Sequence, residues 1–324
     1  MDKTENKYLV LFNARWDIDR YFIENVNTDE VKVASIYKLY KKDFKYKIAV
    51  LWLEKFKLPF QSLWYEDWKK AIENYDTIIV NALNLSWQIL SYIKKKNPNV
   101  RLIVWYWDTV NEKNRLPEKY KAICEVWSFD ERDCDKYGMH KNVQFYYPMN
   151  VESKEAFYDA MFVGQDKGRT QRLSEICDLL QKSGLTVYTY VQYNRKEKRY
   201  LGKEILKPIK YTEIIKLIDQ SRCIIDIPKA GQTGMTMRVL ESLFYAKKLI
   251  TTDKNISKAE FYNPANIFIW DEPNEGELKK FFSLPVEPVS ERILNKYTFD
   301  AWIKNFGFVK NFEKAVEAKV EKKR

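Results

Sequence analysis

The stretch DIPKAGQTGMTMRVLESL, which runs from Asp226 to Leu243, has the residue types needed to hold a phosphorylated ligand. An apolar strand leads into a loop with Gly231 and Gly234, and a helix is expected to begin directly after the loop. The amino-terminus of a helix presents unpaired N–H groups and a partial positive charge, and glycines allow an anion to approach them. This pattern indicates an anion site.

Four side chains of this stretch could contribute. Thr233 and Thr236 can cap the helix or donate hydrogen bonds, and Arg238, one turn in, adds a cation. Glu241 lies two turns in, at a reach that suits the paired hydroxyls of a ribose. An ordinary strand–turn–helix junction with a capping threonine and a surface glutamate is the alternative.

A second stretch, FVGQDKGR from Phe162 to Arg169, places Lys167 and Arg169 in a loop with glycines after another apolar strand. Ligands of open α/β sheets bind outside the carboxyl ends of the strands. We therefore expect both loops to converge on one crevice, where two cations and a helix amino-terminus would stabilise a departing diphosphate. The alternative is a solvated basic turn.

Strands and helices alternate along the chain, as in parallel sheets that are covered on both faces. The strands predicted in the first half are Tyr8–Phe12, Val31–Tyr37, Thr77–Asn81, Leu102–Trp107, Val126–Phe129 and Val143–Tyr147. Helices are predicted over Leu85–Lys96 and over Asp43–Lys55, although the second could equally be a strand. The strands predicted in the second half are Ala160–Val163, Thr186–Val191, Cys223–Ile227, Leu249–Thr252 and Ile267–Trp270.

The polar, proline-containing segment from 146 to 157 interrupts this rhythm and is the predicted domain boundary. The predicted fold class is α/β, with two Rossmann-like doubly wound domains facing a cleft. Residues 1–150 would form an acceptor-side domain and residues 157–290 a donor-binding domain. Residues 291–324 would form a helical segment, with a helix at about 299–322, that packs back toward the first domain.

Composition excludes several classes of protein. The chain has 324 residues and a formal net charge of +11, which suggests an anionic partner or simply a biased genomic composition. No glycine precedes Gly138, so an amino-terminal dinucleotide fingerprint is excluded, and no Walker A motif occurs. Four cysteines without a CxxC pair, no secretory signal and no long apolar run favour a cytoplasmic protein.

Several motifs together resemble bacterial glycosyltransferases of the two-Rossmann (GT-B) architecture, of the type found in capsule, exopolysaccharide and lipopolysaccharide biosynthesis. They are FVGQDKGR, YTEII at 211–215, GQTGMTMRVLESLFYAKKLITTD, LPFQSLWY at 58–65, YDTII at 75–79 and VWYWD at 104–108. The resemblance covers about residues 8 to 275. It implies a nucleotide-diphospho-sugar donor in the second domain, an acceptor on the first, and neither a cofactor nor an obligatory metal.

By position, the resemblance assigns the donor phosphates to two loops, the ribose to Glu241 and the border of the base to Tyr211. The residues expected to contact the donor are Gly164, Lys167, Arg169, Tyr211, Gly231, Gln232, Thr233, Gly234, Met235, Thr236, Arg238 and Glu241. Thr233 departs from the pattern, because many retaining members have an acid there. The stereochemistry of transfer therefore stays open.

The first domain would supply the general base that deprotonates an acceptor hydroxyl. Asp17 and Asp108 both follow strands and are the candidates, and a turn or helix-cap carboxylate is the alternative for each. Trp16 and Trp107 are candidates for stacking on a sugar. The pairs Asp17/Asp19 and Asp133/Asp135 are not predicted to bind a metal.

The expected function is transfer of a sugar to a glycan or polyprenyl-linked acceptor in surface polysaccharide biosynthesis, with Asp17, Asp108, Arg169 and Arg238 as catalytic residues. The alternatives are a nucleotide-sugar epimerase of the same architecture and a basic nucleic-acid-binding protein, although no nucleic-acid-binding motif occurs. Basic segments at 194–210 and 308–324 add the expectation of a peripheral contact with an anionic membrane.

Overall fold

The computed structural model describes residues 7–14, 17–38, 48, 52, 60–82, 87–150, 155–192 and 209–307. The chain divides into two compact units, one formed by Met1–Val143 with Ile303–Arg324 and the other by Gln144–Trp302. The predicted helix Asp43–Lys55, Trp16, and nearly all of the two basic segments lie outside the described residues, apart from isolated positions. No helix among the described residues is long and apolar enough to cross a membrane.

Unit 1 contains a six-stranded parallel sheet. Its spatial order is β2 (Val31–Ser35), β1 (Tyr8–Phe12), β3 (Thr77–Asn81), β4 (Arg101–Tyr106), β5 (Glu125–Ser128) and β6 (His140–Lys141). Among the described residues, the helices of this unit before the chain leaves it are α1 (Asp17–Asn25), α3 (Gln88–Lys96) and α4 (Glu131–Tyr137). Every residue of β1, β3 and β4 is buried, as expected for strands covered on both faces.

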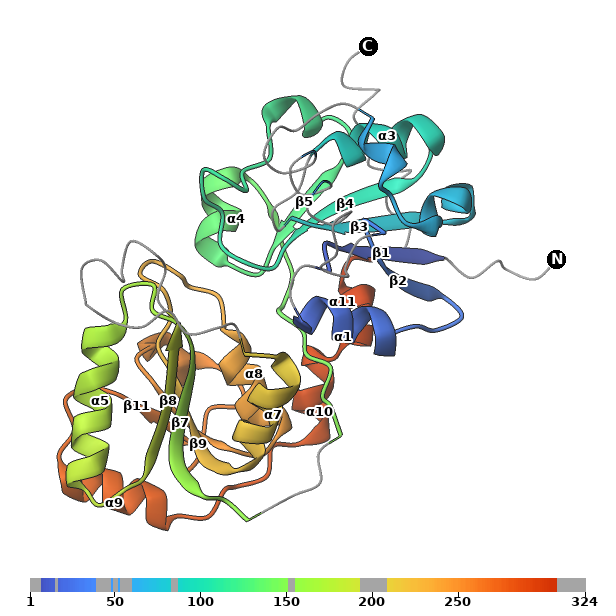
Figure 1. Cartoon of the computed structure of the whole chain (residues 1–324). Coiled ribbons are helices and arrows are strands. Elements are labelled where there is room, and N and C mark those ends of the chain that lie inside the picture. Colours follow the sequence, from blue (N-terminus) through green and yellow to red (C-terminus); the bar gives the residue numbers. More distant parts are fainter. Residues whose placement is uncertain are drawn as a thin grey trace. The chain divides into compact units, whose positions relative to one another are not determined.

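The winding of the chain explains why both faces are covered. Crossovers between parallel strands are right-handed, so the side on which a crossover helix lies depends on the direction in which the chain moves along the sheet. The chain moves from β1 to β2 in one direction and then returns past β1 to β3 in the other. Accordingly, α1 lies on one face of the sheet and α3 on the other (Figure 1).

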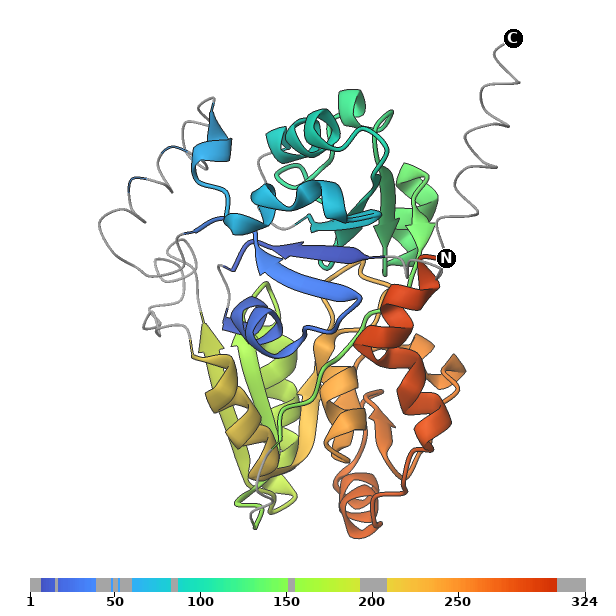
Figure 2. The ribbon, with the colours of Figure 1, turned by 90° about the vertical axis from the view of Figure 1, so that its right-hand side faces the viewer.

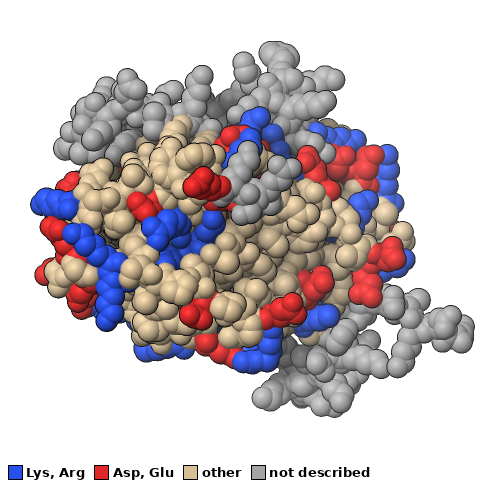
Figure 3. Space-filling model, turned by 90° about the horizontal axis from the view of Figure 1, so that it is seen from below, with Lys and Arg blue, Asp and Glu red and all other residues tan. Residues whose placement is uncertain are grey.

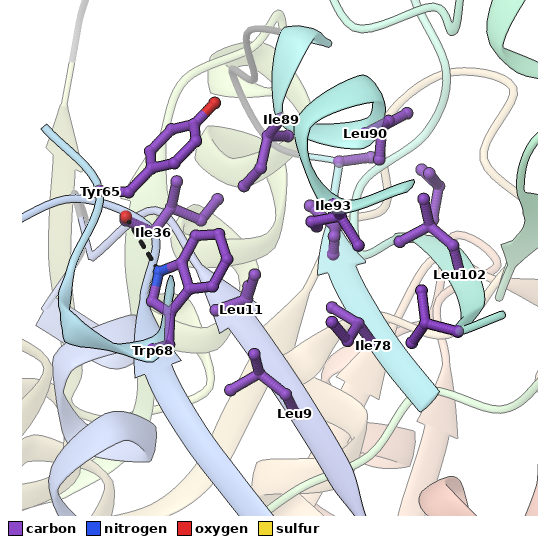
Figure 4. Close-up of a cluster of buried hydrophobic side chains, with 14 of the residues drawn as sticks. Leu9, Leu11, Ile36, Tyr65, Trp68, Ile78, Ile89, Leu90, Ile93 and Leu102 are labelled. Atoms are coloured by element: carbon purple, nitrogen blue, oxygen red, sulfur yellow. Dashed lines mark hydrogen bonds between the residues drawn. The ribbon is translucent and has the colours of Figure 1, made fainter. Parts of the chain in front are cut away.

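One apolar core of unit 1 lies between α3 and the sheet. Ile89, Leu90 and Ile93 are fully buried and pack in one cluster with alternate residues of the strands (Figure 4). Trp68 is in the same cluster and donates from Nε1 to the carbonyl oxygen of Ile36 at 3.2 Å, which satisfies its one polar group. The helical spacing of the three α3 residues is what predicted this helix from the sequence.

Unit 2 contains a five-stranded parallel sheet. Its spatial order is β11 (Ile267–Ile269), β10 (Lys248–Thr251), β9 (Ser221–Asp226), β7 (Tyr158–Gln165) and β8 (Val187–Gln192). Its longer helices are α5 (Thr170–Lys182), α7 (Tyr211–Asp219), α8 (Met237–Phe244) and α9 (Glu275–Ser283). The helix α5 covers one face of the sheet, and α7 and α8 cover the other (Figures 1 and 2).

The two sheets share one winding order, in which the first strand lies between the second and the third. In unit 2 the first strand is β7, and its neighbours are β8 and β9. The predicted fold class, α/β with two Rossmann-like doubly wound domains, is therefore confirmed within each unit. The winding reverses between β7 and β9, and such a reversal is where open α/β sheets bind ligands.

The remaining elements are short. They are α10 (Glu291–Leu294), α11 (Phe299–Asn305) and 3-10 turns at Gln61–Leu63, Asp67–Lys70, Ile72–Asn74, Glu118–Tyr120, Lys254–Lys258 and Asn295–Tyr297. After α11 the chain belongs to unit 1, within which the Phe306 ring packs edge-on against Trp105 and Trp127. There Arg101 forms two 2.8 Å bonds to the Glu125 carboxylate and donates to the carbonyl oxygen of Gly307.

Two predicted elements are wrong. The strand expected at Val143–Tyr147 is replaced by β6, and only Tyr146 forms an isolated bridge, because its amide donates to the carbonyl oxygen of Tyr297 instead of to a sheet neighbour. The helix predicted at about 299–322 is interrupted, because α11 ends at Asn305; residues 308–322 lie outside the described part of the chain. Gly307 has a φ of 74°, which ends the helix, and the last N–H groups bond to carbonyl oxygens three residues back.

Candidate functional site

The two sequence stretches that predict an anion site meet at the switch point of unit 2. The first stretch, FVGQDKGR, covers the end of β7 and the loop that leads to α5. The second stretch begins at Asp226, the last residue of β9, and leads into α8. These strands are hydrogen-bonded neighbours, so their carboxyl ends lie side by side. We call Gly164, Arg169, Asp226, Thr236 and Arg238 the switch-point cluster.

Arg169 joins the ends of the two strands. Its side chain is buried, and it donates to the carbonyl oxygen of Ile227 at 2.7 Å, to that of Asp166 at 3.1 Å and to that of Gln165. Burial, reinforced by the nearby charge of Arg238, lowers the pKa of Arg169 to about 10, so it stays protonated at neutral pH. Its main role in this structure is to hold the loops together.

Arg238 lies beside Arg169 and is more accessible, with a side chain 16% exposed. It donates to the carbonyl oxygen of Val163 at 2.7 Å. Its guanidinium carbon is 4.8 Å from the ring centre of Phe162, and that of Arg169 is 5.4 Å from the same ring. One aromatic ring therefore supports two neighbouring cations.

Gly164 makes room for this arrangement. A Cβ atom at this position would lie 2.3 Å from Nη2 of Arg238 and 3.5 Å from Nη2 of Arg169. Any side chain here would displace the Arg238 guanidinium from its place beside the strand end.

Asp226 is the buried anion of the cluster. Thr236 donates to its Oδ1 at 2.7 Å, Thr251 donates to its Oδ2 at 3.0 Å, and Nη1 of Arg238 lies 3.9 Å away. Burial raises the pKa of this carboxyl, and Arg238 and the two threonines oppose the rise. Sequence reasoning gave Asp226 no role, although a lone acid at the end of a buried strand was a signal that could have found it.

Thr236 does not cap α8, contrary to one expectation. It is the N-cap residue of that helix, but no side-chain cap bond forms and its hydroxyl is directed to Asp226. At α5, in contrast, Oδ1 of Asp166 accepts from the amides of Arg169 and Thr170 at 3.1 and 2.8 Å. The amino-terminus of α5 is thus neutralised by an internal carboxylate, and that of α8 is better able to receive an external anion.

The loop before α8 is folded on itself. Gly231 has a φ of 79°, a backbone conformation that favours glycine, and Gln232 donates from Nε2 to the carbonyl oxygen of Gly234 at 2.9 Å. Gly234 and Met235 are half-buried, and Thr233 is exposed. Lys167, in the other loop, is exposed and has a φ of 47°.

Glu241 is more enclosed than a surface contact for ribose would require. It is 5% exposed, and Tyr211 donates to its Oε1 at 2.9 Å. Burial raises the pKa of this carboxyl, whereas Arg238 and the hydrogen bond from Tyr211 lower it. The structure brings the two predicted residues together, and their contacts with ribose and base stay predictions.

The acceptor-side candidates belong to unit 1. Asp17 is the first residue of α1, and Asp108 follows β4 and accepts from the amide of Thr109 at 2.9 Å. The Trp107 ring lies 5.9 Å from that of Phe12 and 5.4 Å from that of Phe22, so it packs against the core and is half-buried. The catalytic role of either aspartate stays a prediction.

No protein-family model matches the chain, and no curated protein matches it either. Solved structures that resemble it include HepE of Anabaena in complex with UDP and glucose, with 12% identity, a TM-score of 0.47, and 98% of this chain and 100% of that one covered. Sucrose-phosphate synthase from Thermosynechococcus elongatus gives 9% identity, a TM-score of 0.48, and 97% and 100% covered. UDP-GlcNAc 2-epimerase from Methanocaldococcus jannaschii has 12% identity and a TM-score of 0.38, and the match covers 98% of this chain and 100% of that one.

Proposed function

We propose that the chain is a glycosyltransferase of GT-B architecture that uses a nucleotide-diphospho-sugar donor. The observation that carries the proposal is the switch-point cluster. Two guanidinium groups and a helix amino-terminus without a side-chain cap gather at one strand end, next to a glycine whose side chain would displace one of them. A diphosphate is the ligand whose charge and size suit these groups.

In the proposed reaction, an acceptor oxygen bonds to the anomeric carbon and the bond from that carbon to the diphosphate oxygen breaks. Arg238 and the amino-terminus of α8 would stabilise the negative charge that develops on the departing nucleoside diphosphate. Arg169 would hold the two loops in register, and Glu241 would bind the ribose. The proton of the acceptor hydroxyl would pass to Asp17 or Asp108.

The finer parts of the proposal concern the acceptor and the location. We expect a glycan or polyprenyl-linked acceptor of surface polysaccharide biosynthesis, transfer of a hexosyl group without a metal, and a cytoplasmic enzyme that touches the inner face of the membrane. These expectations are supported by the sequence motifs that resemble bacterial glycosyltransferases of surface polysaccharide biosynthesis, such as FVGQDKGR and GQTGMTMRVLESL. The nucleic-acid alternative gains no support from the face in Figure 3, where acidic and basic side chains are interspersed.

The test is an assay of turnover with a panel of nucleotide-sugars in the presence of EDTA. The quantity measured is the nucleoside diphosphate that is released. We expect one donor to be consumed, faster when an acceptor glycan is added, and Arg238→Ala to abolish most of this turnover. Arg172→Ala is the matched control, because Arg172 is exposed on α5 and forms an exposed ion pair with Glu175. Interconversion of the sugar without an acceptor would indicate the epimerase instead, and no turnover of any donor would contradict the proposal.

A further inference from the structure

A row of three tyrosine hydroxyls, two of them on buried side chains and the third on the half-buried Tyr245, leads to the Glu241 carboxylate within unit 2. Oη of Tyr211 lies 2.9 Å from Oε1 of Glu241 and 2.8 Å from Oη of Tyr146. Oη of Tyr146 lies 3.4 Å from Oη of Tyr245. The Tyr245 oxygen in turn lies 2.8 Å from the amide nitrogen of Met149 and 3.3 Å from its carbonyl oxygen.

The row has a direction, because each hydroxyl has a single hydrogen. An ionised Glu241 can only accept, so Tyr211 donates to it, Tyr146 donates to Tyr211, and Tyr245 donates to Tyr146. The amide of Met149 then donates to Tyr245. If Glu241 is protonated, the bond between Glu241 and Tyr211 and the two bonds between tyrosine hydroxyls can reverse, and Tyr245 then donates to the carbonyl oxygen of Met149. Both ends are therefore satisfied in either state.

We propose that Tyr211, Tyr146 and Tyr245 are positioning residues that orient the Glu241 carboxylate and stabilise its ionised form. The ionised form is the one that accepts hydrogen bonds from both hydroxyls of a ribose, so the consequence for ligand binding rests on the proposed function. The row itself does not, because it exists in the protein without a ligand.

The surroundings of Glu241 show why such support is needed. Burial favours the neutral carboxyl, and the negative charge of Asp226 at the end of β9 acts in the same direction. Arg238, on the same helix, opposes both. The hydroxyls of Tyr211 and Tyr146 remain protonated donors, since burial raises the pKa of each above its usual value. Aligned donors in a buried row polarise one another, which strengthens the last bond to Glu241.

The experiment is a carbon-13 NMR titration of the glutamate side-chain carboxyls in the full chain, without nucleotide. The Glu241 signal is assigned by its loss in Glu241→Gln. Tyr211→Phe keeps the ring and removes the hydroxyl, and we expect its Glu241 midpoint about one pH unit higher than in the wild type, a tenfold change in the protonation constant.

Tyr146→Phe is the second variant, because it leaves the direct bond from Tyr211 to Glu241 in place. We expect a smaller shift in the same direction. Tyr158→Phe is the control; Tyr158 lies in β7, its ring packs 5.1 Å from that of Tyr188, and its substitution should leave the Glu241 midpoint unchanged.

An unchanged or lower midpoint in both variants would overturn the inference. The titration and the proposed function can fail separately. If no nucleoside diphosphate binds but the midpoints move as expected, the row stands and the glycosyltransferase proposal falls. Where a nucleotide does bind, its affinity should weaken as the pH falls through the Glu241 midpoint, and at a higher pH in Tyr211→Phe.

Discussion

At the scale of single residues, Gly164 is the position where the smallest change should have the clearest effect. Its missing side chain leaves room for the Arg238 guanidinium, which is the flexible end of a long side chain and can move aside. Gly164→Ala should therefore change stability little and weaken nucleoside diphosphate binding about tenfold, the value of one charge-assisted hydrogen bond. Calorimetric titration measures this.

A double-mutant cycle is the control for that substitution. If Gly164→Ala acts by moving Arg238, it should weaken binding no further in a protein that already has Arg238→Ala. Equal effects of Gly164→Ala in both backgrounds would show that the glycine acts in some other way.

Arg169 should contribute to the stability of the folded protein, because its buried side chain joins the ends of two strands. Arg169→Ala removes the guanidinium donor to three carbonyl oxygens at the ends of β7 and β9, of which that of Asp166 keeps a bond from the amide of residue 169, and we expect it to lower the free energy of unfolding by about 3 kcal/mol. Arg172→Ala, at an exposed position of the adjoining helix, should stay within about 0.5 kcal/mol of the wild type. Urea unfolding measures both, and equal losses would contradict the role given to Arg169.

Asp226 predicts a pH dependence of stability. Its pKa is raised in the folded protein, chiefly by burial, above the usual value of 3.8. At a pH between 3.8 and the pKa of Asp226 in the folded protein, the folded chain holds a proton that the unfolded chain has released. The free energy of unfolding therefore falls as the pH rises through that window, and it levels off above it. The wild type should therefore lose stability relative to Asp226→Asn as the pH rises. Urea unfolding at several pH values tests this. A free energy of unfolding of the wild type, minus that of Asp226→Asn, that stays constant or rises with pH would contradict it.

At the scale of elements, the segment after α11 depends on a buried ion pair. Arg101 holds both the Glu125 carboxylate and the carbonyl oxygen of Gly307. Arg101→Met leaves Glu125 without its cation in a mostly buried place, and should lower the free energy of unfolding by about 3–5 kcal/mol. Replacing both partners by methionine should recover part of that loss, and no recovery in chemical unfolding would count against the ion pair.

The elements also show what the sequence could predict. Strands such as Thr77–Asn81 are continuous apolar runs, and the helical spacing of Ile89, Leu90 and Ile93 marks α3, so local pattern was sufficient. The strand predicted at Val143–Tyr147 has a similar composition, but the amide of Tyr146 pairs with the carbonyl oxygen of Tyr297, 151 residues further along, which no local pattern reveals. The end of α11 could have been predicted from Gly307.

The same distinction holds for the candidate site. The glycines and arginines of the two loops were visible as motifs, and the adjacency of β7 and β9 follows from the winding order. The hydrogen bond from Thr236 to Asp226 and the tyrosine row behind Glu241 could not be predicted. They depend on side chains ten to 99 residues apart meeting in the folded unit.

At the scale of the whole molecule, two sheets of the same winding order provide two switch points, one in each unit. In unit 2 this point holds two guanidinium groups and the start of α8. The corresponding loop of unit 1, after β1, leads to Asp17. The account therefore assigns the nucleotide to one unit and the acceptor to the other, and the two assignments can be tested separately.

Hydrogen exchange with and without nucleoside diphosphate, read by mass spectrometry across the whole chain, tests the central claim most directly. Saturating ligand at 100 times its dissociation constant should stabilise the protein by about 2.7 kcal/mol. The account predicts that slower exchange is concentrated in residues 163–170 and 226–245, and that Arg238→Ala removes most of the effect. Protection confined to unit 1, or protection of equal size in the Arg238→Ala protein, would contradict it.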